Sequence, residues 1–141
     1  MVTNDPVHQQ WLQSFIAEAG GIAGTVHVQV GEDLVLTAAH NIPPQVVQAV
    51  SHVARGKGMA GLAQVRREPV RTCDLQTDDS GRIRPGARAV EAQAAIALPV
   101  LDAAGGTVAV VGVAWAGAGD IDAATERRLA GRARELARAI A

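Results

Sequence analysis

The sequence predicts an α+β fold with a mostly antiparallel sheet. Residues 24–40 read as a β-hairpin, and the apolar runs 92–102 and 107–116 flank a glycine-containing turn and read as a second hairpin. Amphipathic helical patterns stand at both ends of the chain. Strands joined by short turns, with helices at the ends and in the middle, are typical of this class. No long linker divides the 141 residues, so we expect a single domain over residues 1–141.

The first predicted elements are a helix over 6–19 and the hairpin. Asp5 and Pro6 suit an N-cap and a first helical position, and Gly20–Gly21 ends the helix. In GTVHVQV, valines alternate with His27 and Gln29, which predicts a half-buried strand with His27 facing solvent. LVLTAAH, residues 34–40, is the returning strand.

The next elements are two helices separated by a glycine-rich turn. A helix beginning at 41–44 would place four valines on one face, although β-branched residues are mediocre helix formers; these are Val46, Val47, Val50 and Val53. The stretch GKGMAG lacks the spacing of a phosphate-binding P-loop, so we read it as the turn that begins a helix at about 59–67.

The second half of the chain contains three predicted strands and a final helix. Residues 70–75 form a short strand, and a polar loop over 76–88 follows. In the strand over 92–102, Pro99 marks an edge or a bulge. The run over 107–116 is nearly all apolar and should be the central strand. Asp120 or Asp122 caps the last helix, which has an apolar face made by Leu129, Ala133, Leu136 and Ile140.

Composition and charge exclude several classes of protein. The formal net charge is −1, which argues against nucleic-acid binding, although Arg and Lys outnumber Asp and Glu between residues 55 and 88. No apolar run is long enough to span a bilayer, and the N-terminus has no secretory signal pattern. The single cysteine, Cys73, excludes an internal disulfide. We therefore expect a cytoplasmic protein that binds neither nucleic acid nor membrane.

Four phrases in this order make the sequence resemble a GAF domain over about residues 15–140. They are LVLTAAHNIPPQVV, GKGMAGLAQVRREPV, CDLQTDD and AAIALPVLDAAGGTVAVVGVAWA. The resemblance implies a GAF/PAS-like layout: a central antiparallel sheet of five or six strands, the N- and C-terminal helices on one face, and a ligand pocket on the other. It also implies a sensory module that acts in signalling through a partner protein.

The resemblance also places a candidate ligand site around the middle helix, the third predicted strand and the entry to the fourth. An arginine and an amide that converge on an apolar hollow would suit a small anion. Trp115 could form the floor of that pocket or pack beneath a helix. The candidate ligand-binding residues are Met59, Ala60, Cys73, Asp74, Thr77, Arg88, Gln93 and Trp115.

Two alternatives remain open. The first is a structural module without a ligand, in which the apolar stripes of the terminal helices pair two copies into a homodimer. The second is a degenerate relative of the GAF-type free methionine sulfoxide reductases, whose nucleophilic and resolving cysteines are missing from the corresponding regions here. Cys73 could be a small buried hydrophobic residue of its strand, or a redox-sensing thiol with its pKa lowered by Arg71. We predict no catalytic residue, no metal site and no cofactor, and hence no enzyme.

Overall fold

The structure is a computed structural model, and it describes residues 5–72, 94–116 and 121–140. Its centre is a six-stranded sheet in the order β3-β2-β1-β6-β5-β4, in which every pair of neighbours is antiparallel. The strands are β1 (Ala23–Val30), β2 (Asp33–His40), β3 (His52–Val53), β4 (Val70–Thr72), β5 (Ala94–Leu101) and β6 (Thr107–Trp115). The predicted α+β class and antiparallel sheet are confirmed.

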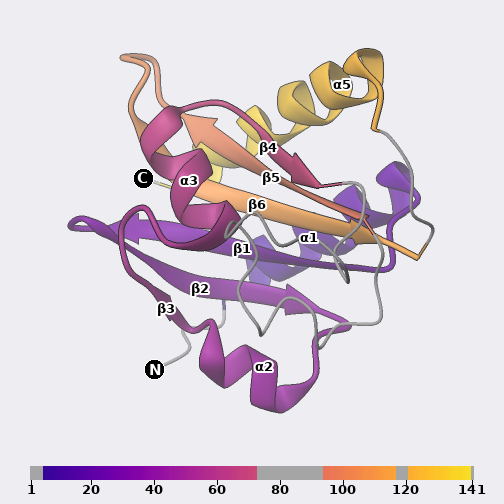
Figure 1. Cartoon of the computed structure of the whole chain (residues 1–141), viewed down its shortest axis with the longest axis horizontal. Helices are drawn as coiled ribbons and strands as arrows, with labels where there is room; N and C mark the ends of the chain where they lie inside the picture. The colour runs from indigo at the N-terminus through magenta and orange to yellow at the C-terminus, as the bar shows by residue number, and fades with distance from the viewer. Residues whose placement is uncertain (1–4, 73–93, 117–120, 141) are drawn as a thin grey trace.

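Helices cover both faces of this sheet. They are α1 (Pro6–Ala19), α2 (Pro44–Ala49), α3 (Gly58–Arg66) and α5 (Ala123–Arg134), which a 3₁₀ turn, η1 (Glu135–Ala139), extends. Figure 1 shows α1 behind the sheet and α3 in front of it. We call the face that α1 and α5 cover the back face, and the face that α3 covers the front face.

The main core lies on the back face. Leu12, Phe15 and Ile16 of α1 and Leu129 of α5 are at most 3% exposed and pack with sheet residues of β1, β5 and β6. Burying a side chain of this size is worth about 1.5–3 kcal/mol. The apolar stripes of the two terminal helices are therefore used within one chain, against its own sheet.

The N-terminal turn of α1 completes the outer edge of β2. The short strand β3 pairs only with Leu34 and Val35. Beyond it, the Asp5 amide donates to the Thr37 carbonyl at 2.8 Å, and the Gln9 side chain both donates to the Ala39 carbonyl at 2.8 Å and accepts from the Ala39 amide at 3.1 Å. These bonds leave less of the edge free to pair with another chain.

The predicted second helix is shorter than expected. α2 ends at Ala49, and Val53 belongs to β3, where it pairs with Leu34. The Leu36 amide donates to the Ser51 carbonyl at 2.9 Å, so the chain after α2 runs beside β2. Val53 suits this environment because a β-branched side chain packs better on a strand than within a helix. The four valines therefore do not share one helical face.

Two finer expectations fit the structure. The ladder between β4 and β5 ends at Ala97, so Pro99 lies where β5 has a strand neighbour only on the β6 side among the described residues. This is the edge-like position that a residue without an amide hydrogen needs. Asp122, rather than Asp120, caps α5 by accepting from the Thr125 amide at 2.7 Å.

Three glycines define the turn that begins α3. Gly56 and Gly58 have φ values of +78° and +64°, which L-residues other than glycine rarely adopt. Gly61, in the first turn of α3, packs directly on the backbone of Gly56. A Cβ atom at position 61 would lie 2.6 Å from the Gly56 carbonyl carbon. GKGMAG is therefore a turn whose glycines let the helix approach the preceding loop.

We expect Gly61→Ala to lower the free energy of unfolding by about 1–3 kcal/mol, because the added methyl group must displace backbone. Gly131→Ala is the matched control, since its Cβ atom meets nothing within 4 Å in α5. That change should raise stability by about 0.5–1 kcal/mol. Urea unfolding of both variants checks this, and equal stabilities for the two would contradict the close approach.

Candidate functional site

The front face of the sheet carries a floor of small side chains. The register aligns Ala39, Thr25, Gly112 and Ala97 across four strands, and Ala114 and Ala95 form the next row. Paired residues point to the same face of a sheet. Ala97 packs with residues of α3, which places both rows on the front face. We define the small-residue floor as Thr25, Ala39, Ala95, Gly112 and Ala114.

This floor is less buried than the opposite side of the same strands. All five of its residues are partly exposed. The neighbouring residues that point to the back face, among them Val26, Ile96 and Val113, are at most 2% exposed. These five floor residues are thus less deeply buried than their back-face neighbours, although Ala23 and Ala97, which lie in the same two rows on the front face, are also buried.

At Gly112 the floor has no side chain of its own. A Cβ atom at this position would lie 3.1 Å from the Thr25 hydroxyl oxygen, so the threonine side chain reaches over the glycine. No hydrogen bond to the Thr25 hydroxyl is recorded among the described residues. The floor therefore offers one polar group within an apolar surface, as small-molecule sites commonly do.

Helix α3 forms a wall beside the floor. Met59, Ala60 and Leu62 are partly buried against a second apolar cluster that includes Ala97 and Val110 of the sheet. Met59 and Ala60, two of the predicted site residues, therefore do lie on the front face. This wall belongs to the part of the chain that the sequence resemblance places beside a ligand pocket.

Gln64 holds α3 in place. Its side-chain amide donates to the Glu32 carbonyl at 2.7 Å and to Gln29 Oε1 at 3.2 Å. Its backbone carbonyl accepts from the Thr107 hydroxyl at 2.9 Å. The helix is thereby tied to both hairpins. A wall fixed at two points can keep a defined distance from the floor.

His27 also lies on the front face, and its predicted exposure is wrong. The side chain is only 4% exposed, because β1 is an inner strand and the segment after α2 lies beside it. His27 Nε2 lies 2.8 Å from the Val50 carbonyl oxygen. A carbonyl can only accept, so Nε2 carries the hydrogen. His27 Nδ1 is buried and has no partner among the described residues.

Burial lowers the pKa of His27 below its usual value, because the charged imidazolium loses its hydration; the bond to the Val50 carbonyl acts weakly in the opposite sense. The neutral side chain with hydrogen on Nε2 leaves Nδ1 as an acceptor only. This is the one buried titratable group on the described part of the front face for which a shifted pKa is resolved.

Trp115 lies on the other side of the sheet from Met59 and Ala60. Its indole N–H donates to the Ala19 carbonyl at the end of α1 at 2.9 Å, and its ring packs against the back-face core. Side chains alternate along β6, so Trp115 shares a face with Val113 rather than with Gly112. Of the two interpretations of Trp115, the structure supports packing beneath a helix, and Trp115 cannot floor a pocket beside α3.

The remaining predicted site residues, Cys73, Asp74, Thr77, Arg88 and Gln93, fall outside the described residues. Arg71, which would lower the pKa of Cys73 if that residue were a redox-sensing thiol, donates to the Ile121 carbonyl at 2.6 Å and pairs with Glu126 of α5 at 3.4 Å. Its guanidinium therefore joins β4 to the C-terminal helix.

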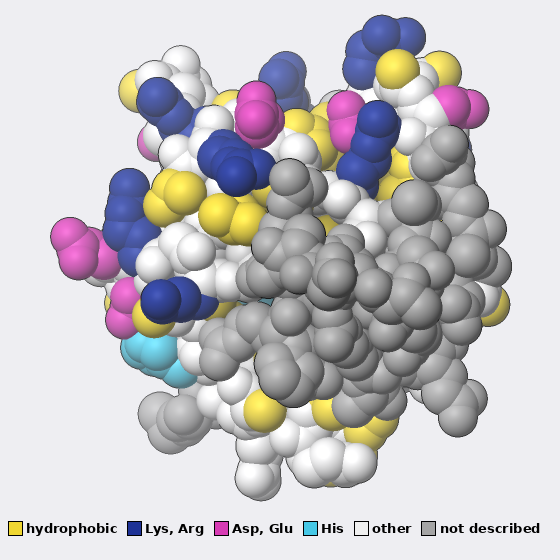
Figure 2. All heavy atoms as spheres, viewed as in Figure 1, with side chains coloured by type: hydrophobic (Ala, Val, Ile, Leu, Met, Phe, Trp, Pro, Cys, Tyr) yellow, Lys and Arg dark blue, Asp and Glu magenta, His cyan; other side chains and the backbone are white. Residues whose placement is uncertain are grey.

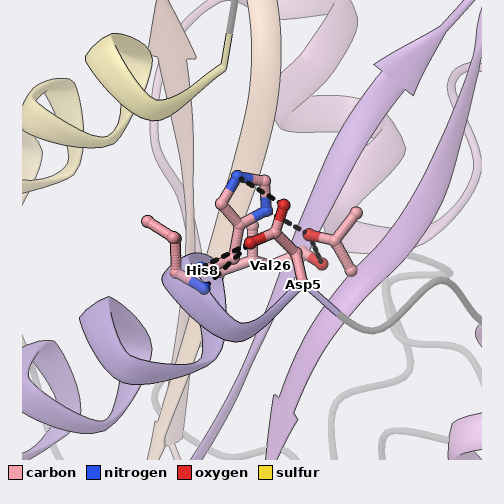
Figure 3. Close-up of polar contacts among 5 residues, drawn as sticks. Asp5, His8 and Val26 are labelled. Atoms are coloured by element: carbon pink, nitrogen blue, oxygen red, sulfur yellow. Dashed lines mark hydrogen bonds and ion pairs between the residues drawn. The ribbon is translucent and has the colours of Figure 1, made fainter.

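A carboxylate, an imidazole and a hydroxyl lie close together at the start of α1, with the imidazole between the other two, as in hydrolase triads (Figure 3). His8 Nδ1 lies 2.8 Å from the Thr37 hydroxyl, but His8 Nε2 is 3.7 Å from Asp5 Oδ2. Asp5 instead accepts from the amides of Val7 and His8 as the helix N-cap. His8 and Thr37 are buried between α1 and the sheet, so this cluster attaches the helix to β2.

Other kinds of site find no support in the described part of the chain. No three His, Cys, Asp or Glu side chains lie close enough there to hold a metal ion. No helix in the same ranges is long and apolar enough to cross a membrane. Figure 2 shows Asp and Glu interspersed with Lys and Arg among the coloured residues, rather than one continuous basic patch.

Comparison with solved structures identifies the fold. A type II free methionine-R-sulfoxide reductase from Thermoplasma acidophilum superposes with a TM-score of 0.75 at 16% identity, over 95% of this chain and 92% of that chain. The GAF domain region of a putative membrane protein from Geobacter sulfurreducens gives 0.76 at 13% identity, over 95% and 90%. The chain has the GAF domain fold.

A third structure agrees. The GAF domain of the Acinetobacter phosphoenolpyruvate-protein phosphotransferase gives a TM-score of 0.68 at 15% identity, over 96% of this chain and 93% of that chain. No family model matches the sequence, and no curated protein matches it. At these identities the likeness establishes the GAF fold, whose members here include both GAF domains and a reductase.

Sequence reasoning missed the three front-face residues Thr25, His27 and Gly112. One signal was present, because an isolated glycine within an apolar strand often marks a close backbone approach or an opening in the packing. Thr25 and His27 share a face of β1, but their alternation with valine looked like solvent exposure. Only the strand order shows that β1 lies inside the sheet.

The burial of His27 predicts a pH dependence of stability. Its pKa is lowered in the folded state. Below about pH 6.5, His27 therefore binds a proton more readily in the unfolded chain than in the folded chain. Stability should therefore fall as pH decreases from about 7 towards 5, with a slope from this residue of at most about 1.4 kcal/mol per pH unit. Above pH 7 this contribution should be constant.

Urea unfolding at several pH values measures this slope. His27→Gln should flatten it, whereas His52→Gln, at an exposed histidine that pairs with Asp33, should leave the contribution of His27 in place. An unchanged slope in the His27 variant would show that this side chain is protonated equally in both states.

Proposed function

We propose that this protein is a ligand-binding regulatory module whose ligand lies on the front face, between the small-residue floor and α3. The observation that carries the proposal is the contrast between the two faces of one sheet. Over the middle of the sheet, the back-face residues Val26, Ile96 and Val113 are at most 2% exposed, whereas the alanine, glycine and threonine residues of the floor are partly exposed. A packing unit has no need of this asymmetry, but a recognition surface does.

The rigid parts around the floor support a sensing role. α3 is fixed by Gln64 to both hairpins, and α1 and α5 rest directly on the strands that form the floor. A ligand that shifts β1 or β6 would therefore move the helices on the opposite face. We propose that a partner protein reads this change, as the GAF domain fold of signalling proteins suggests.

The structures of free methionine-R-sulfoxide reductases suggest an amino-acid-sized ligand as one class to test. Reduction by two thiols of one chain would require a second cysteine, and this sequence has one. We therefore propose binding without turnover. The homodimer expected from the sequence stays a prediction, and the stripes that suggested it are occupied by the chain's own sheet.

A ligand panel tests the proposal. Thermal shift should be measured with free amino acids including methionine sulfoxide, nucleotides and small anions. A true ligand present at 100 times its dissociation constant should stabilise the fold by about 2.7 kcal/mol. Failure of every compound in the panel to raise the melting temperature would favour the structural module.

Gly112→Leu separates a hollow floor from a packed one. If the front face is hollow, the new side chain should occupy it and abolish the ligand-induced shift, and the loss of stability without ligand should be limited to the cost of displacing the Thr25 hydroxyl, which a Cβ atom here would approach to 3.1 Å. A filled site would be overpacked, at a cost of about 1–3 kcal/mol. Gly131→Leu, in an open position on α5, is the matched control and should retain the shift.

A further inference from the structure

We propose that His27 selects the ligand of the front-face site: Nδ1 accepts a hydrogen bond from an N–H or O–H group of a molecule that lies over the small-residue floor. The ligand class is then a compact hydrogen-bond donor, such as an amide, an amine or an alcohol, and not a bare anion. The inference rests on the proposed function, because it specifies the chemistry of that same site.

The position of His27 relative to the floor supports this assignment. His27 and Thr25 are two residues apart on β1, so both point to the front face, with Cβ atoms about 6–7 Å apart. The register pairs His27 with Val110 and Thr25 with Gly112 on the neighbouring strand. His27 therefore stands at the border between the floor and the apolar cluster beneath α3.

The tautomer decides which chemistry His27 can recognise. The Val50 carbonyl at 2.8 Å requires hydrogen on Nε2, and so Nδ1 presents a lone pair. A ligand that brings another lone pair, such as a carboxylate or nitrate oxygen, would be repelled there. A ligand that brings a hydrogen would pair the acceptor.

His27 Nδ1 has no hydrogen-bond partner among the described residues, and this supports a ligand contact independently of the position of the residue. Nearly all buried polar atoms in proteins have a hydrogen-bond partner, so an exception needs an explanation. Nδ1 is one of four buried side-chain atoms without a recorded partner in the described ranges, and of these only His27 is a neighbour of the floor on its own strand. A ligand or an ordered water would satisfy it, and the experiment separates these two occupants.

The charges of the described residues favour the same ligand class. The floor consists of alanine, glycine and threonine, so it supplies no cation to an anionic ligand. Arg71, on the strand that neighbours β5, is bound to the Ile121 carbonyl and to Glu126 of α5. Within the described ranges, then, His27 and Thr25 offer an acceptor and a hydroxyl, and Thr72, which pairs with Ala95 at the edge of the floor, is a further uncharged polar residue there.

The test compares two probes of nearly equal size, acetamide and acetate, on the 141-residue chain. Acetamide has N–H donors, and acetate at neutral pH has only acceptors. Each is titrated to high millimolar concentration while NMR follows the amides of Thr25 and Gly112 and the side-chain nitrogens of His27. Exchange between His27 and a long-lived water is measured in the same samples.

We expect acetamide to shift all three residues saturably, with the largest side-chain change at His27 Nδ1, and acetate to bind at least about tenfold more weakly. Gly112→Leu should abolish these shifts. Thr25→Val, which keeps the shape and removes the hydroxyl, should retain the change at Nδ1, and so should His52→Gln. The spectra of the wild-type protein alone decide the outcome, so the test does not depend on a variant at His27.

Three results would overturn the inference, and they differ in what they imply. Equal binding of acetate and acetamide over the floor would leave the ligand site standing and remove His27 as its selector. If acetamide shifts the floor amides while a long-lived water stays bound to Nδ1, then water rather than the ligand is the hydrogen-bond partner of Nδ1. No saturable shift at the floor with either probe would remove the front-face site itself, and the proposed function with it.

Discussion

The register of β1 against β6 is the constraint on which the rest of the structure depends. Pairing Val26 with Val111 sends both valines into the back-face core, and the same register pairs Thr25 with Gly112 on the front. Because side chains alternate, a slip of one residue would bury Thr25 beneath α1 and move the valines to the front. The core and the floor are therefore two consequences of one alignment. Neither can change without the other, and so the stability of the fold protects the shape of the site.

Helix α1 enforces this register from behind. A Cβ atom at Gly24 would lie 2.8 Å from Ile16 Cδ1, so the helix packs against bare backbone at this point of β1. Its N-terminal turn extends to the outer edge of the sheet, where it forms hydrogen bonds with Thr37 and Ala39 of β2. One helix thus covers the core and completes an edge.

The sequence predicts the local elements better than their environments. Turn glycines, the N-caps Asp5 and Asp122 and the two hairpins were all recognisable, because each depends on residues close together in the chain. His27 was misjudged because alternation assigns a side chain to a face but does not say what covers that face. Val53 was placed on a helix because its partner, Leu34, lies 19 residues earlier. Trp115 was assigned to the right strand, but only the contact with Ala19 shows which face it occupies.

The arginines of the described residues bear on the expectation of an anionic ligand, which rested on Arg88 and Gln93 outside those residues. Among the described residues, two arginines with recorded contacts act as links between elements: Arg71 joins β4 to α5, and Arg132 binds Glu18 of α1 at 2.7 Å and lies over the Trp11 ring. Exposed pairs of this kind contribute about 0–1 kcal/mol each, so their main effect is to position the helices. Arg71 shows that a base from the positively charged stretch 55–88 can link two elements of the fold instead of facing a ligand. Among the described residues, the polar groups of the front face include the Thr25 hydroxyl, the neutral His27 imidazole and the Gln64 amide. We propose that a surface built from such groups discriminates by hydrogen-bond direction rather than by charge.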